Sequence, residues 1–101
     1  MARSRAAALT QEIAEHVAIQ ALSYIAAEPD RLGGFLAATG IGPDRIRAAA
    51  REPGFLGGVL DYLAGDEALL LDFAEVENLA PDLVVKARVI LGAGDPEQDA
   101  P

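Results

Sequence analysis

The chain has 101 residues, with eight basic residues against sixteen acidic ones and a formal net charge of −8. Its length suits one domain, and a hydrophobic fraction of 51% provides a core and excludes a disordered chain. The acidic balance argues against a primary role on nucleic acid or an anionic membrane, and no apolar run approaches the roughly 18 residues that span a bilayer. The absence of cysteine excludes disulfides and thiolate metal sites and fits a cytoplasmic location.

Prolines mark the starts of most predicted helices. Proline is tolerated at the first helical position because its missing N–H would have no intrahelical partner there. Four prolines open apolar segments with helical spacing, and three of them are followed by Asp, which places a carboxylate in the positive first turn. With Thr10 and the run 65–67 as further start signals, the pattern predicts six helices over about 10–27, 29–39, 43–51, 53–64, 66–77 and 81–91.

The predicted fold is therefore all-α, a compact bundle of six helices in one domain. No stretch alternates like a strand over a useful length. We expect a flexible N-terminus over 1–9, the helical domain over 10–91, and a disordered polar tail over 92–101 that follows a C-cap at Gly92.

An internal repeat relates residues 21–46 to residues 59–84 at an offset of 38. Because the identities keep one register, we predict a duplicated three-helix unit, packed about a pseudo-two-fold axis. Chance similarity between two Ala- and Leu-rich helical stretches is the alternative. Gly40 pairs with Asn78, and both residue types tolerate a left-handed C-cap, so we predict a positive φ at Gly40. The identical pairs are Leu22/Leu60, Tyr24/Tyr62, Ala26/Ala64, Leu32/Leu70, Phe35/Phe73, Pro43/Pro81 and Asp44/Asp82.

The turn at residues 40–43, Gly-Ile-Gly-Pro, resembles the hairpin of the helix-hairpin-helix family, which offers backbone N–H groups to a DNA phosphate. The second copy reads Asn-Leu-Ala-Pro and lacks both glycines, and the arginines around the first copy are matched by carboxylates, which weakens any positive field. A helix C-cap followed by an N-terminal proline is the simpler interpretation. The candidate nucleic-acid site comprises Gly40, Ile41, Gly42, Arg45 and Arg47.

Catalytic and metal signals are missing from the sequence. His16 is the only histidine, and without cysteine it has too few partners for a metal site. The many carboxylates form no spaced calcium loop, and no nucleophile–base pattern or phosphate loop is present. We therefore predict no catalytic residue, no cofactor and no metal, and a protein that is not an enzyme.

The last predicted helix is apolar on nearly every side, and Leu71 falls off the main apolar face of the helix before it. Such a helix either docks in the core or leaves surface for a partner. The candidate partner surface comprises Leu71, Val85 and Val89. Helix 10–27 also has an apolar arc wider than a surface helix needs, which indicates that other helices or another chain cover it.

Several segments of the chain share one pattern of residues with a known family: 18–27, 28–32, 35–40, 55–56, 59–61 and 66–70. Together they resemble a bacterial family of small helical proteins, catalogued as domain of unknown function thirty-five seventy-two. That family has no assigned activity, so the resemblance implies only an all-helical fold and a bacterial cytosol. The leading hypothesis is a non-enzymatic module that binds an unknown protein partner or itself, without tight nucleic-acid binding. The alternative is a divergent paired hairpin module on nucleic acid, and a small-molecule enzyme comes third.

Overall fold

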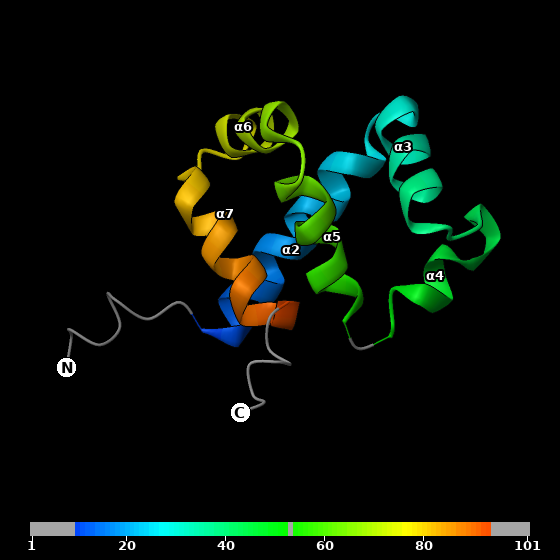
Figure 1. Cartoon of the computed structure of the whole chain (residues 1–101), viewed down its shortest axis with the longest axis horizontal. Helices are drawn as coiled ribbons and strands as arrows, with labels where there is room; N and C mark the ends of the chain where they lie inside the picture. The colour runs from blue at the N-terminus through cyan, green and yellow to red at the C-terminus, as the bar shows by residue number, and fades with distance from the viewer. Residues whose placement is uncertain (1–9, 53, 94–101) are drawn as a thin grey trace.

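Six α-helices follow one another in the part of the chain that the computed structural model describes, residues 10–52 and 54–93 (Figure 1). Within these ranges there is no strand, so the all-α prediction is confirmed. The predicted flexible N-terminus, 1–9, and residues 94–101 of the predicted tail, 92–101, lie outside the described residues, whereas residues 92 and 93 belong to the π turn at the end of the last helix. The helices are α2 (Gln11–Ala26), α3 (Pro29–Thr39), α4 (Ile46–Ala49), α5 (Phe55–Ala64), α6 (Glu67–Val76) and α7 (Pro81–Arg88), with a 3₁₀ turn η1 (Pro43–Arg45) and a π turn η2 (Val89–Ala93).

Most predicted helix starts are confirmed. Pro29, Pro43 and Pro81 stand at the first positions of α3, η1 and α7. The Thr10 hydroxyl accepts a hydrogen bond from the Ile13 backbone N–H at 3.1 Å and caps α2. The Asp66 carboxylate caps α6 in the same way. These side chains satisfy N–H groups that the first helical turn leaves without partners.

Two predicted helices differ from the observed ones. The segment predicted as one helix over 43–51 is a 3₁₀ turn followed by the short α4, because only Ile46 and Ala49 there find partial burial and little packing holds a longer helix. The helix predicted from 53 begins at Phe55 instead. Gly54 precedes it with a left-handed φ of 90°, which ends the preceding turn.

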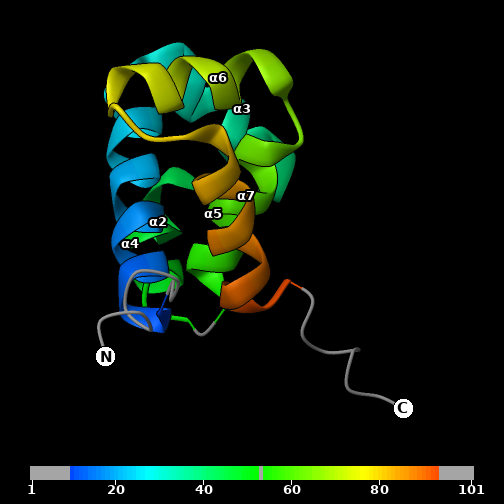
Figure 2. The same ribbon diagram turned by 90° about the vertical axis from the view of Figure 1, so that its left-hand side faces the viewer.

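The core forms around α2, which packs against α3, α5, α7 and η2. Figure 2 shows α7 antiparallel to α2, with α6 lying across one end of the bundle. The wide apolar arc of α2 is therefore covered mostly by neighbouring helices, although Ile13 and Ile19 remain about half exposed at 45% and 51%. The largest fully buried side chains are Phe35, Phe73, Ile25, Leu60, Leu63, Val59 and Val84.

The turns after α3 and α6 each contain one residue with a left-handed φ. Gly40 has a φ of 77°, which confirms the predicted left-handed cap, and Asn78 has a φ of 59°. These are the two residues that the offset of 38 pairs with each other. Each turn then leads to a proline that starts the next helical segment.

Candidate functional site

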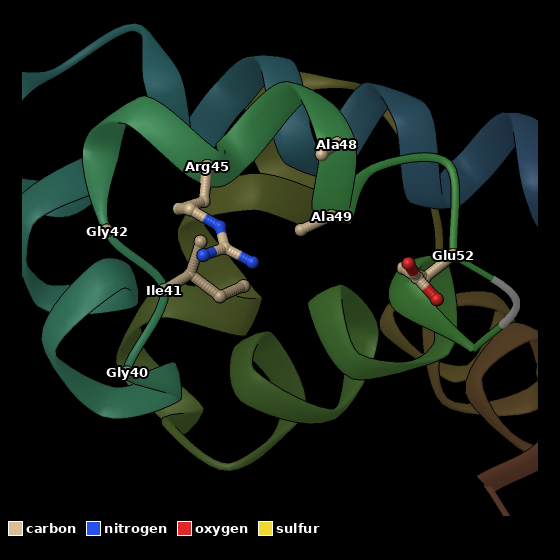
Figure 3. A pocket seen from close by; sticks show the side chains of 7 residues that line it. All are labelled: Gly40, Ile41, Gly42, Arg45, Ala48, Ala49 and Glu52. Carbon is tan, nitrogen blue, oxygen red and sulfur yellow. The ribbon is translucent and has the colours of Figure 1, made fainter.

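A hollow of about 450 Å³ opens between the end of α3 and the loop after α4 (Figure 3). We call it the hairpin groove, because its lining includes four of the five residues of the predicted hairpin site. Arg45 extends across Ile41 into the hollow, and Glu52 lies at the other end. The lining residues are Gly40, Ile41, Gly42, Arg45, Ala48, Ala49 and Glu52.

The local sequence explains the shape of the groove. Gly40 ends α3 in the left-handed region, donating its N–H to the Leu36 carbonyl at 2.8 Å. Gly42 is extended, with φ −74° and ψ 152°, and Pro43 then starts η1 in a new direction. A helix, a reversal and a second short helix thus surround the hollow, and Arg45 extends into it.

The segment around the groove carries a small positive excess. Residues 40–52 contain three arginines, Arg45, Arg47 and Arg51, against the carboxylates Asp44 and Glu52. All five side chains are exposed. The two ion pairs within the described ranges lie elsewhere, at Lys86–Asp82 and Arg88–Asp61. Of these five, Arg45 and Glu52 line the groove itself, so its lining holds one cationic and one anionic side chain, at opposite ends.

The residues of the predicted partner surface lie on three elements. Leu71 on α6 is 47% exposed, Val85 on α7 is 36% exposed, and Val89 at the start of η2 is 57% exposed. By contrast, Val84 and Ala87 of the same last helix are fully buried. Both interpretations of that apolar helix hold in part, because one face docks in the core and the other remains open.

A polar cluster around Tyr24 was not predicted from the sequence. The Tyr24 hydroxyl donates to an Asp72 carboxylate oxygen at 2.5 Å. The Arg31 guanidinium lies 3.9 Å from the ring centroid and donates to the Tyr24 backbone carbonyl through Nε and Nη2. Burial raises the pKa of Tyr24 from 10.0 to about 12, and the bond to Asp72 contributes while Arg31 opposes the rise. This cluster ties α2, α3 and α6 together.

The sequence contains only a weak signal for the cluster around Tyr24. Asp72 lies 48 residues from Tyr24, and an exposed carboxylate on a helix has many possible partners. Only the fold shows which one it meets. His16 lies exposed on α2, and within residues 10–52 and 54–93 no group of three or more His, Cys, Asp or Glu side chains could hold a metal ion.

A second hollow, of about 360 Å³, lies beside α5 and α7. Asp61 accepts a hydrogen bond from Arg88 Nη1 at 2.8 Å there, while the buried Arg88 Nε has no partner among the described atoms. The Gly57 backbone allows close approach, since a Cβ on it would lie 2.9 Å from the Leu91 carbonyl oxygen. The bare backbone at Gly57 therefore lets η2 pack closely against α5.

The fold and the site define a small all-α protein with a surface groove that Arg45 reaches into and Glu52 borders. None of the helices in the described ranges is long and apolar enough to cross a membrane. The model of the family described as "Protein of unknown function (DUF3572)" matches residues 11–94, and the chain belongs to this family. No curated protein matches the chain, and no solved structure matches it either.

Proposed function

We propose that this chain is a non-enzymatic module of the bacterial cytoplasm that binds a partner protein or a second copy of itself. The observation that supports it is apolar surface outside a complete core. Leu71, Val85 and Val89 are exposed although the aromatic and aliphatic core beneath them is closed. Exposed apolar side chains on a folded domain release water when another surface covers them, and acidic rims are compatible with such interfaces.

A non-enzymatic role agrees with the burial pattern. No charged side chain is buried in the described part of the chain. Catalytic acids and bases usually work where desolvation and neighbouring charges shift their pKa. Tyr24 has a raised pKa, but its ring packs in the core and its hydroxyl is bound by Asp72.

Photo-cross-linking in the host cell tests the proposal. A photoreactive amino acid is placed singly at Leu71, Val85 and Val89, and at Ala37 as an exposed control on α3. We expect a discrete cross-linked protein from at least one of the first three positions and none from Ala37. Equal labelling at all four positions, or no product anywhere, would contradict the proposal.

Nucleic-acid binding by the hairpin groove is the second candidate, favoured by Arg45 and Arg47 beside the glycine turn. The net charge of −8 opposes it. Non-specific binders reach a Kd of roughly 10⁻⁴–10⁻⁶ M at physiological salt even with a favourable field. In fluorescence anisotropy with short single- and double-stranded oligonucleotides we expect no saturation below about 10 μM at that salt. Saturable binding that Arg45→Ala and Arg47→Ala weaken would promote this function.

A further inference from the structure

Charge is distributed unevenly between two ends of the fold. Residues 61–82 contain seven acidic residues and no basic one, whereas residues 40–52 contain three arginines against two carboxylates. In Figure 1, α6 lies at the upper left of the molecule and α4 at the lower right. The acidic surface of α6 and the groove arginine, Arg45, therefore lie far apart within one molecule but can meet between two.

The apolar side chains of α4, of which Ala49 lines the groove, are only partly covered. Ile46 and Ala49 of α4 are half-buried, while Val84 and Ala87, which stand 38 positions later in α7, are fully buried. α7 is eight residues long and packs against both α2 and α5, and α4 is a single turn. The first half of the fold therefore leaves open the apolar positions that the second half closes.

α6 offers a side chain that fits such a surface. Leu71 is 47% exposed, and Glu67 and Glu75 lie four residues before and after it. Side chains four residues apart share one face of a helix. Leu71 is thus an apolar group between two exposed carboxylates. The groove offers the apolar side chains of Ile41 and Ala49 with Arg45 reaching across Ile41, while Glu52 lies at its far end.

We propose that the hairpin groove of one molecule binds α6 of a second copy. Leu71 enters against Ile41 and Ala49, and Glu67 or Glu75 pairs with Arg45. This inference rests on the proposed protein-binding function and names its partner. Groove and α6 are different surfaces, so the contact either occurs twice, reciprocally, in a closed two-fold dimer, or occurs head to tail in a ring or an open chain.

Local complementarity has to overcome general repulsion, because each copy carries a net charge of −8. Charged pairs at an interface fix its register and partner, while the apolar centre supplies most of the affinity. Replacing the central apolar side chain by a charge, or reversing the matching charge, therefore weakens association by at least roughly tenfold.

Sedimentation velocity from about 5 to about 500 μM, a range that brackets the Kd of a small transient interface, tests the proposal. The wild-type mass should rise with concentration. Leu71→Asp and Arg45→Glu should each remain monomeric. Val76→Asp, at another exposed position of α6, and Lys86→Glu, at an exposed basic residue of α7, should associate like wild type. Helical circular dichroism confirms that each variant is folded.

Mixing the two defective variants gives the sharper result. Leu71→Asp retains the groove, and Arg45→Glu retains α6, so an equimolar mixture should form a one-to-one complex although neither associates alone. A monomeric wild type, association that survives both changes, or a mixture that stays monomeric would each overturn the inference. A monomeric wild type whose Arg45 is instead required for oligonucleotide binding would assign the groove to nucleic acid and overturn it too.

Failure of this inference differs from failure of the proposed function. If the wild type is monomeric but still cross-links to a different protein through Val85 or Val89, the self-docking inference is wrong and the proposed protein-binding function stands. If it is monomeric and forms no cross-link at any of the three apolar positions, both the inference and the proposed function are wrong.

Discussion

The ring of Tyr24 packs against the ring of Phe73, with 5.4 Å between centroids and an interplanar angle of 59°. The residues that stand at the same places in the other half of the repeat make the reciprocal contact. Tyr62 packs against Phe35, with 5.3 Å between centroids and an angle of 78°. Each tyrosine therefore contacts the phenylalanine of the opposite half, as a two-fold relation requires.

The hydroxyl groups of the two tyrosines also meet residues of the opposite half. Tyr24 donates to Asp72, and the residue 38 positions before Asp72 is Gly34. A Cβ on Gly34 would lie 3.0 Å from the Tyr62 hydroxyl, so that hydroxyl lies against the glycine. A duplicated unit would give such reciprocal contacts, but α4 and α7 differ in length and burial, and the duplication stays a prediction.

Double-mutant cycles test this exchange. Replacing both members of Tyr24/Phe73, or of Tyr62/Phe35, by Leu should reveal a coupling free energy of about 0.5–1.5 kcal/mol for each pair, because aromatic contacts add to simple burial. The pairs within one half, Tyr24/Phe35 and Tyr62/Phe73, serve as controls and should be additive within about 0.5 kcal/mol. Chemical denaturation supplies the four free energies of each cycle. Stronger coupling within halves than between them would contradict the exchange.

Glycine at position 40 is required by the backbone rather than by space. Its φ is 77°, and an added Cβ would meet nothing within 4 Å. We expect Gly40→Ala to lower the free energy of unfolding by about 1 kcal/mol, the strain of a left-handed alanine.

Gly33 is the matched control. It lies inside α3 with open space around it, so Gly33→Ala should stabilise the fold by about 0.5–1 kcal/mol through helix propensity and a less flexible unfolded chain. Denaturation midpoints measure both variants. The same sign of change in the two would show that the backbone argument is wrong.

The sequence predicts helix starts well where proline is followed by aspartate. Pro29, Pro43 and Pro81 each begin a helical element, and Asp follows each one. Gly54 follows the fourth proline instead and takes a left-handed φ, so α5 begins after it. Helix-start signals depend on the restricted backbone of the residues in the first turn. A glycine there has a freer backbone, so the proline before it no longer fixes the start of the helix.

The site is predicted less completely, for a physical reason. The hairpin turn is a local feature and can be read from residues 40–43, but the groove beside it exists because α4 stops after one turn. That length depends on how much apolar surface the rest of the fold can cover. The Tyr24–Asp72 bond likewise depends on packing between segments 48 residues apart.

High pH should destabilise the fold through Tyr24. Its folded pKa is raised from 10.0 to about 12, first by burial and then by the bond to Asp72. The folded state thus keeps the phenolic proton after the unfolded state has lost it. Below pH 10 this group adds no pH dependence, and stability falls as the pH rises from 10 to about 12.

Tyrosinate absorbance measures this directly. In a Tyr62→Phe background the remaining tyrosine should ionise well above pH 10, together with unfolding, and Asp72→Asn should change that titration less than unfolding the protein does. Ionisation of Tyr24 near pH 10 in the folded protein would contradict the burial that the structure assigns to its ring.

The neighbouring glycines of α5 should respond in opposite directions to the same substitution. A Cβ on Gly57 would lie 2.9 Å from the Leu91 carbonyl oxygen, which is backbone and cannot rotate away. Gly57→Ala should therefore push η2 from α5 and destabilise the fold by about 1–3 kcal/mol, the usual cost of overpacking. Gly58 has nothing within 4 Å, so Gly58→Ala should stabilise α5 by about 0.5–1 kcal/mol. Thermal and chemical denaturation compare the two. A neutral Gly57→Ala would show that α5 and η2 pack less closely than described. The placement of η2, and with it the exposure of Val89, would then no longer be supported.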